Sequence, residues 1–154
     1  MTHAPHSTLR KAAARSRPFH SRGSSLGITA TTPAELIRKL ESGFSFHALQ
    51  NLASLSGLAV SRLASLMGIP ERTLARRRSM GKLTADESER LLRLSTVFEQ
   101  AVELFDGDVA AAVGWLNTPR KALESASPLE YSRTDPGARE VERLIGRLEH
   151  GVFS

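Results

Sequence analysis

The stretch that decides the fold is VSRLASLMGIPERTLARRRSMG, residues 60–81. Two short apolar patterns follow each other here, and Gly68 supplies the turn between them. The small Ala64 lets the second helix approach the first closely, which is the spacing of a helix-turn-helix. In such a motif the second helix enters the major groove of DNA. The apolar residues that would lock the two helices together are Leu63, Ala64, Met67, Ile69 and Leu74.

The second helix of this motif is rich in arginine. If Leu74 is buried, a rotation of about 100° per residue turns Arg72, Arg76 and Ser79 outward. Arginine side chains can reach phosphates and the edge of guanine, so the sequence predicts a DNA-contacting helix. The alternative is an ordinary exposed helix, although exposed faces usually carry both signs of charge. The predicted DNA contacts are Arg72, Thr73, Arg76, Arg77, Arg78 and Ser79.

The motif departs from the usual helix-turn-helix pattern in two places. An apolar residue is usual where Arg77 stands, and a glutamine is usual near Val60. Arg77 and Arg78 flank the buried side of the helix, where their stems can run along the edge of the core. Either the packing differs from the usual one, or Arg77 binds a phosphate.

Signals for helix starts recur along the chain and predict an all-α protein. Thr32, Thr84 and Ser127 each precede a glutamate three residues later, which is the pattern of a capping box. Apolar residues repeat at helical spacing over residues 91–105 and again over 138–151. No alternating strand pattern interrupts them. The longer of these two segments is expected to be a central strut.

The charge is unevenly distributed and suggests two different partners. Residues 1–34 carry five basic residues and no acid, and residues 35–82 carry eight basic and three acidic residues. Residues 83–154 carry eight basic and thirteen acidic residues. Accidental clustering in a soluble protein is the alternative. The predicted organisation is a disordered basic arm (1–31), a helix-turn-helix region with a long connecting helix (32–106) and a helical partner-binding domain (107–154).

Composition and motifs argue against several classes of protein. The absence of cysteine excludes disulfides and suits a reducing cytoplasm. No apolar run approaches the roughly 18 residues of a membrane span, although the acid-free N-terminus could mimic an organellar transit peptide. The five histidines show no metal-ligand spacing, and no phosphate loop or nucleophile elbow is present. We therefore expect a cytoplasmic protein that is not an enzyme, with no membrane partner, metal or cofactor.

The C-terminal half carries the most specific pattern of the sequence. Its pieces are WLNTP at 115–119, Ala122-Leu123, SPL at 127–129, GAREVE at 137–142 and LIGRLEHGVFS at 144–154. Together they resemble the toxin-binding domain of the Xre/MbcA/ParS antitoxins. Upstream, RTLARRRSMGKLTADESERLLRL (72–94) is similar to the DNA-binding half of the same family. The resemblance covers about residues 44–154, and the arm resembles nothing known to us.

This resemblance implies an antitoxin that inhibits a RES-domain toxin, an enzyme that consumes NAD. It also implies binding to operator DNA of its own operon as a homodimer. A freestanding helix-turn-helix regulator, whose C-terminal half dimerises or senses a ligand, is the alternative. The C-terminal tail either enters the toxin or folds back on the core. The predicted toxin contacts are Arg139, Glu142, Arg143, Arg147, His150, Gly151, Val152, Phe153 and Ser154.

Overall fold

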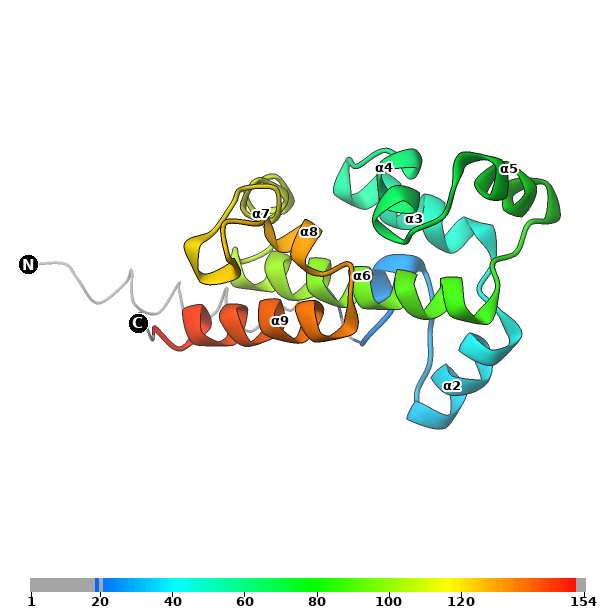
Figure 1. The fold of residues 1–154 in the computed structure, drawn as a ribbon. Coiled ribbons are helices and arrows are strands. Elements are labelled where there is room, and N and C mark those ends of the chain that lie inside the picture. Colours follow the sequence, from blue (N-terminus) through cyan, green and yellow to red (C-terminus); the bar gives the residue numbers. More distant parts are fainter. Residues whose placement is uncertain (1–18, 20, 152–154) are drawn as a thin grey trace, which may run out of the picture.

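The computed structural model describes residue 19 and residues 21–151, and this part of the chain is helical and contains no β-strand (Figure 1). The all-α prediction is therefore confirmed. Two short 3-10 turns, η1 and η2, accompany the α-helices. The elements are η1 (Ser24–Leu26), α2 (Pro33–Ser42), α3 (Phe46–Ser56), α4 (Val60–Leu66), α5 (Glu71–Met80), α6 (Ala85–Leu104), α7 (Val109–Leu116), η2 (Lys121–Leu123), α8 (Pro128–Tyr131) and α9 (Asp135–Glu149).

Helix α6 is the central strut, and η1, α2, α3, α7 and α9 all contact it. Figure 1 shows α3, α4 and α5 beside its N-terminal part, and α7 beside its C-terminal end. Helix α9 lies along α6, and α2 and η1 also contact it. Leu91, Val97 and Ala101 on α6 have no exposed surface. The expectation of a central strut from the apolar pattern at 91–105 agrees with this arrangement.

The predicted helix starts are formed by the side chains expected to form them. Thr32, Thr84 and Ser127 accept hydrogen bonds from the amides of Glu35, Glu87 and Glu130, respectively. Only at Thr84 does the glutamate return the bond, because the Thr84 amide donates to Glu87 Oε1 at 2.9 Å. This full capping box fixes the first turn of α6.

Residues 21–31, which the sequence analysis assigned to a disordered arm, are ordered. Leu26 is only 2% exposed and belongs to the core. Glu99 on α6 accepts hydrogen bonds from the Ser25 hydroxyl and amide and from the Gly23 amide. The buried carboxylate therefore holds η1 against the strut. The arm prediction is wrong for this segment, while residues 1–18 and 20 lie outside the described residues.

The surroundings of Glu99 set the direction of its pKa. Burial raises the pKa of the carboxyl, and the hydrogen bonds from Ser25 and Gly23 oppose that effect only in part. The donors to this carboxylate are mainly neutral groups, so they stabilise its negative charge less than a cation in direct contact would. Glu99 is thus a buried anchor that carries a desolvation cost.

Replacing Leu26 by alanine is expected to lower the free energy of unfolding by about 2–5 kcal/mol, because it removes a buried side chain and leaves a cavity. Chemical denaturation followed by circular dichroism measures this change. The exposed Thr29→Ala variant in the same segment is the control and should unfold like the wild type. Equal stability of the two variants would mean that residues 21–31 are not part of the folded core.

Candidate nucleic-acid and partner-binding surfaces

Helices α4 and α5 form the predicted helix-turn-helix. Gly68 lies in the turn between them with a φ of +71°, a left-handed conformation that favours glycine. The Ile69 amide donates to the Ala64 carbonyl at 2.9 Å and closes the turn. The five residues predicted to lock the two helices are all buried: Leu63, Ala64, Met67, Ile69 and Leu74.

Helix α5 presents an exposed, basic face. Leu74 is its one buried residue, as the sequence analysis assumed. Arg72, Arg76 and Ser79 are exposed, and within the described part of the chain the two arginines form no ion pair. Thr73 is half-buried. Unpaired guanidinium groups on an exposed helix attract a polyanion without first breaking an internal contact.

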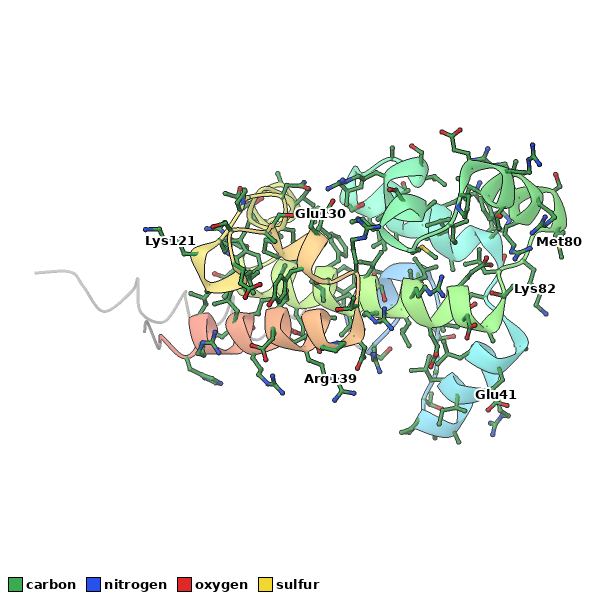
Figure 2. All side chains as sticks on the ribbon, in the orientation of Figure 1. Glu41, Met80, Lys82, Lys121, Glu130 and Arg139 are labelled. Carbon is green, nitrogen blue, oxygen red and sulfur yellow. The ribbon has the colours of Figure 1, made fainter. Side chains whose placement is uncertain are left out.

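Arg78 has a different environment on the same helix. Its side chain is exposed, and its guanidinium carbon lies 5.5 Å from the centre of the Phe46 ring. This cation–π contact leaves the positive charge near the surface. Figure 2 shows Met80 and Lys82, which follow closely in the sequence, at the same end of the molecule as α5. Arg78 is therefore accessible to an anion, and its contact with DNA stays a prediction.

Arg77 is not an outward-facing residue. Its Nε donates to Glu87 Oε1 at 2.7 Å, and the two side chains are only 13% and 9% exposed. The packing thus differs from the usual motif because an ion pair replaces the apolar contact at this position. The structure gives Arg77 an internal partner, so its predicted contact with DNA is not supported by its position.

The Arg77–Glu87 pair shifts the pKa of both side chains. Burial opposes ionisation of Glu87, but the hydrogen bonds from Arg77 and from the Thr84 amide outweigh it, so the pKa of Glu87 lies below its usual value. The hydrogen bond to Glu87 likewise raises the pKa of Arg77. Both groups are therefore held in their charged forms.

A lowered pKa in the folded state means that Glu87 stabilises the fold at any pH above the usual glutamate value of about 4.3. This stabilisation is lost as the pH falls through the lower, folded-state value. The Glu87→Gln variant should thus be less stable than the wild type near pH 7, and the difference should shrink below about pH 4. Denaturation of both proteins across this pH range tests the sign; a difference that grows on acidification contradicts it.

Helix α9 forms the second candidate surface. Its inner face is buried through Ala138, Val141 and Ile145. Gly137 is the first residue of this face and has no room for a side chain, since a Cβ atom there would lie 1.8 Å from the Tyr131 carbonyl oxygen. The glycine of the GAREVE stretch is thus required by the close approach of α8.

Two arginines of α9 are paired with acids on its outer side. Arg139 lies 3.0 Å from Asp135, and Arg143 pairs with Glu140. Glu142 is half-buried and accepts a hydrogen bond from Gln100 on α6 at 3.0 Å. Figure 2 shows Arg139 pointing away from the body of the molecule. The predicted partner contacts Arg139 and Arg143 are therefore exposed, and Glu142 contributes to the packing of α9.

The remaining predicted toxin contacts lie at the end of α9. Arg147 is half-buried, and His150 and Gly151 are exposed. Gly151 follows the helix with a φ of +69°. Val152, Phe153 and Ser154 lie outside the described residues, so their contacts stay predictions.

Sequence reasoning missed a groove between α6 and α9. Its volume is about 430 Å³, and its lining includes Arg22, Arg93, Thr96, Arg139 and Glu142. Arg22 donates to the Thr96 hydroxyl at 2.9 Å. It belongs to the segment that the sequence analysis considered disordered, so no pattern could place it beside α9.

A bridge of charged groups links α8 to α4 of the helix-turn-helix. Glu130 on α8 lies 3.1 Å from Arg62 on α4 and 3.4 Å from Arg133. Figure 2 shows Glu130 on the side of α8 that faces the helix-turn-helix. These side chains are about two-fifths to one-half exposed, so the contact stabilises the fold little.

The described residues contain no group of three or more His, Asp or Glu side chains that could hold a metal ion. None of their helices is both long and apolar enough to cross a bilayer.

The fold and these surfaces define an all-α DNA-binding protein with a separate partner-binding domain. Residues 35–95 match the family profile of the antitoxin Xre-like helix-turn-helix domain. Residues 100–151 match that of the antitoxin Xre/MbcA/ParS C-terminal toxin-binding domain. The two matches meet within α6, whereas the sequence analysis placed its boundary at 106/107, which stays a prediction.

Curated relatives agree with the family profiles. The chain is 40% identical over 130 residues to an antitoxin Xre of Yersinia enterocolitica, covering 84% of this chain and 88% of the relative. It is 34% identical to an antitoxin Xre of Photorhabdus laumondii over the same shares of both chains. An antitoxin Xre of Pseudomonas putida is 32% identical over 54% of this chain and 52% of its own length.

The chain belongs to the Xre antitoxin family, with a helix-turn-helix DNA-binding domain and a toxin-binding domain. The resemblance stated from the sequence is confirmed. These families are not enzymes, and neither is this protein. A freestanding regulator is not supported, because the C-terminal half matches a toxin-binding domain.

Proposed function

We propose that this antitoxin neutralises a RES-domain, NAD-consuming toxin and represses its own operon by binding operator DNA as a homodimer in the cytoplasm, without a membrane partner. The observation that carries the proposal is the separation of two differently charged surfaces on one strut. Helix α5, beside the N-terminal end of α6, carries Arg72 and Arg76, which form no ion pair among the described residues. Helix α9, which lies along α6, carries arginines paired with acids of the same helix.

In the DNA-binding half, α5 acts as the recognition helix. Arg72 and Arg76 reach the phosphates or the guanine edge, and Thr73, Arg78 and Ser79 add contacts beside them. A helix of ten residues covers only a short half-site. Because helix-turn-helix proteins gain affinity by reading two half-sites about one DNA turn apart, the homodimer is the form that supports repression.

Replacing Arg72 and Arg76 together by alanine should weaken binding to the operator. Each lost phosphate contact lowers the slope of log K against log salt by about 0.9, so the double variant should lose up to about 1.8. Fluorescence anisotropy with a promoter duplex at several salt concentrations measures both quantities. The matched control is Lys121→Ala with Arg143→Ala, which removes the same charge far from α5. If both double variants lose the same affinity, α5 is not the recognition helix.

In the toxin-binding half, the outer side of α9 and the tail form the contact. Arg139, Arg143, Arg147 and His150 present charged and polar groups, and Gly151 ends the helix before the tail. An apolar tail that enters an enzyme cleft must offset the entropy lost on ordering. Full burial of Phe153 in such a cleft would contribute about 1.5–3 kcal/mol, or roughly ten- to hundredfold in affinity.

The double substitution Val152→Ser with Phe153→Ser is expected to leave folding and DNA binding unchanged and to reduce neutralisation of the toxin. Growth rescue and cellular NAD in cells that express a cognate RES-domain toxin provide the readout, at matched antitoxin abundance. A parallel variant, Arg139→Glu with Arg143→Glu, tests the helix face separately. Complete rescue by the tail variant but not by the helix variant would assign inhibition to α9 alone.

A further inference from the structure

We infer that Arg77 is a positioning residue, which sets the orientation of the recognition helix through Glu87 and makes no contact with DNA. The inference rests on the proposed role of α5 as the helix that reads DNA. It assigns different tasks to neighbouring arginines of one helix, since Arg72 and Arg76 are exposed and Arg77 is paired inside the protein.

The pair connects α5 to the fixed first turn of α6. Glu87 Oε1 accepts from Arg77 Nε at 2.7 Å and from the Thr84 amide at 2.9 Å. The Glu87 amide in turn donates to the Thr84 hydroxyl. One carboxylate oxygen thus serves both the cap of α6 and the guanidinium of α5. A rotation of α5 that moves Arg77 therefore has to break its bond to Glu87 or draw the Glu87 side chain out of the capping box.

Few other side chains restrain α5 about its own axis. Leu74 is its one buried residue, and Pro70 provides no side-chain cap at its start. Another side-chain restraint is the exposed Arg78, whose guanidinium lies over the Phe46 ring. The chain after the helix is held by the bond from the Phe46 amide to the Gly81 carbonyl, at 2.9 Å. That bond fixes where α5 ends but not how far the helix is turned. Hydrogen bonds to base edges require side chains placed within a fraction of an ångström, so the rotation matters for recognition.

A contact of Arg77 with phosphate would be unfavourable. The guanidinium would have to leave Glu87, and a largely buried carboxylate would then remain unpaired close to the negatively charged DNA. Breaking a buried pair by removing one partner is strongly destabilising. Exposed arginines on the same helix can neutralise phosphates without that cost. Arg77 therefore compensates the charge of Glu87 and leaves the phosphates to its neighbours.

The test compares Arg77→Met, Glu87→Gln and their combination in the full chain. Glu87→Gln retains the cap, because glutamine also closes a capping box. Lys82→Met is the matched control, since it removes one positive charge from an exposed residue just after α5 without touching Glu87. The probes are a duplex selected by the wild-type chain from a random library and a scrambled duplex of equal composition. Circular dichroism establishes that each variant is folded at the temperature of the binding assay.

We expect Arg77→Met and Glu87→Gln each to lose about tenfold in affinity for the selected duplex, with the salt slope on the scrambled duplex unchanged. The double variant should lose little more than Arg77→Met alone, because both changes act on the same pair: one removes the donor and the other removes the negative charge that holds it. The result for Glu87→Gln is the sharpest, since removing a negative charge near DNA would otherwise strengthen binding.

The opposite pattern would overturn the inference. If Arg77 contacts phosphate, Arg77→Met lowers the salt slope on both duplexes by about 0.9. Glu87→Gln then leaves affinity unchanged or raises it, because it releases the arginine. Should Arg77→Met fail to fold, Glu87→Gln alone decides between the two outcomes. Failure of the proposed function differs from both, because Arg72→Ala and Arg76→Ala would then bind the selected duplex like the wild type.

Discussion

Helix α6 must bury side chains on almost every side, and the rest of the structure depends on how this requirement is met. Its 20 residues include two carboxylates, Glu87 and Glu99, that are less than a tenth exposed. A buried carboxylate requires partners because its desolvation is costly. Each of the two satisfies this need by holding a peripheral element: Glu87 holds α5, and Glu99 holds the segment around η1.

The two carboxylates differ in the chemistry of their partners. The partner of Glu87 is a guanidinium, and its pKa lies below the usual value. Glu99 has neutral donors from Ser25 and Gly23, and burial raises its pKa. As the pH rises, the first group therefore adds stability to the fold and the second removes it. The carboxylate with a cationic partner thus holds the helix of the helix-turn-helix, and the one with neutral donors holds the segment around η1.

The sequence predicted what local patterns encode and failed where a residue depends on a distant one. The capping signal at Thr84, the turn at Gly68 and the buried face of α9 follow from spacings of a few residues. Residues 21–31 lack a period of their own, and their order depends on Glu99, more than 70 positions away. The prediction for Arg77 failed for the same reason. Its position on α5 followed from helical spacing, but its partner Glu87 on α6 did not.

The separation of the two surfaces explains how a chain with an acidic half can bind DNA. Helix α6 is about 30 Å long, at 1.5 Å per residue, and α5 and α7 lie at its two ends. At physiological salt, charges are screened over about 8 Å, so the acidic residues near α7 would repel DNA at α5 only weakly. Asp86 and Glu89, exposed in the first turns of α6, are acidic residues that lie nearer to α5. On α9, Arg139 and Arg143 are paired with neighbouring acids, which lowers the field of that helix further. Each surface can therefore select its own class of partner by charge.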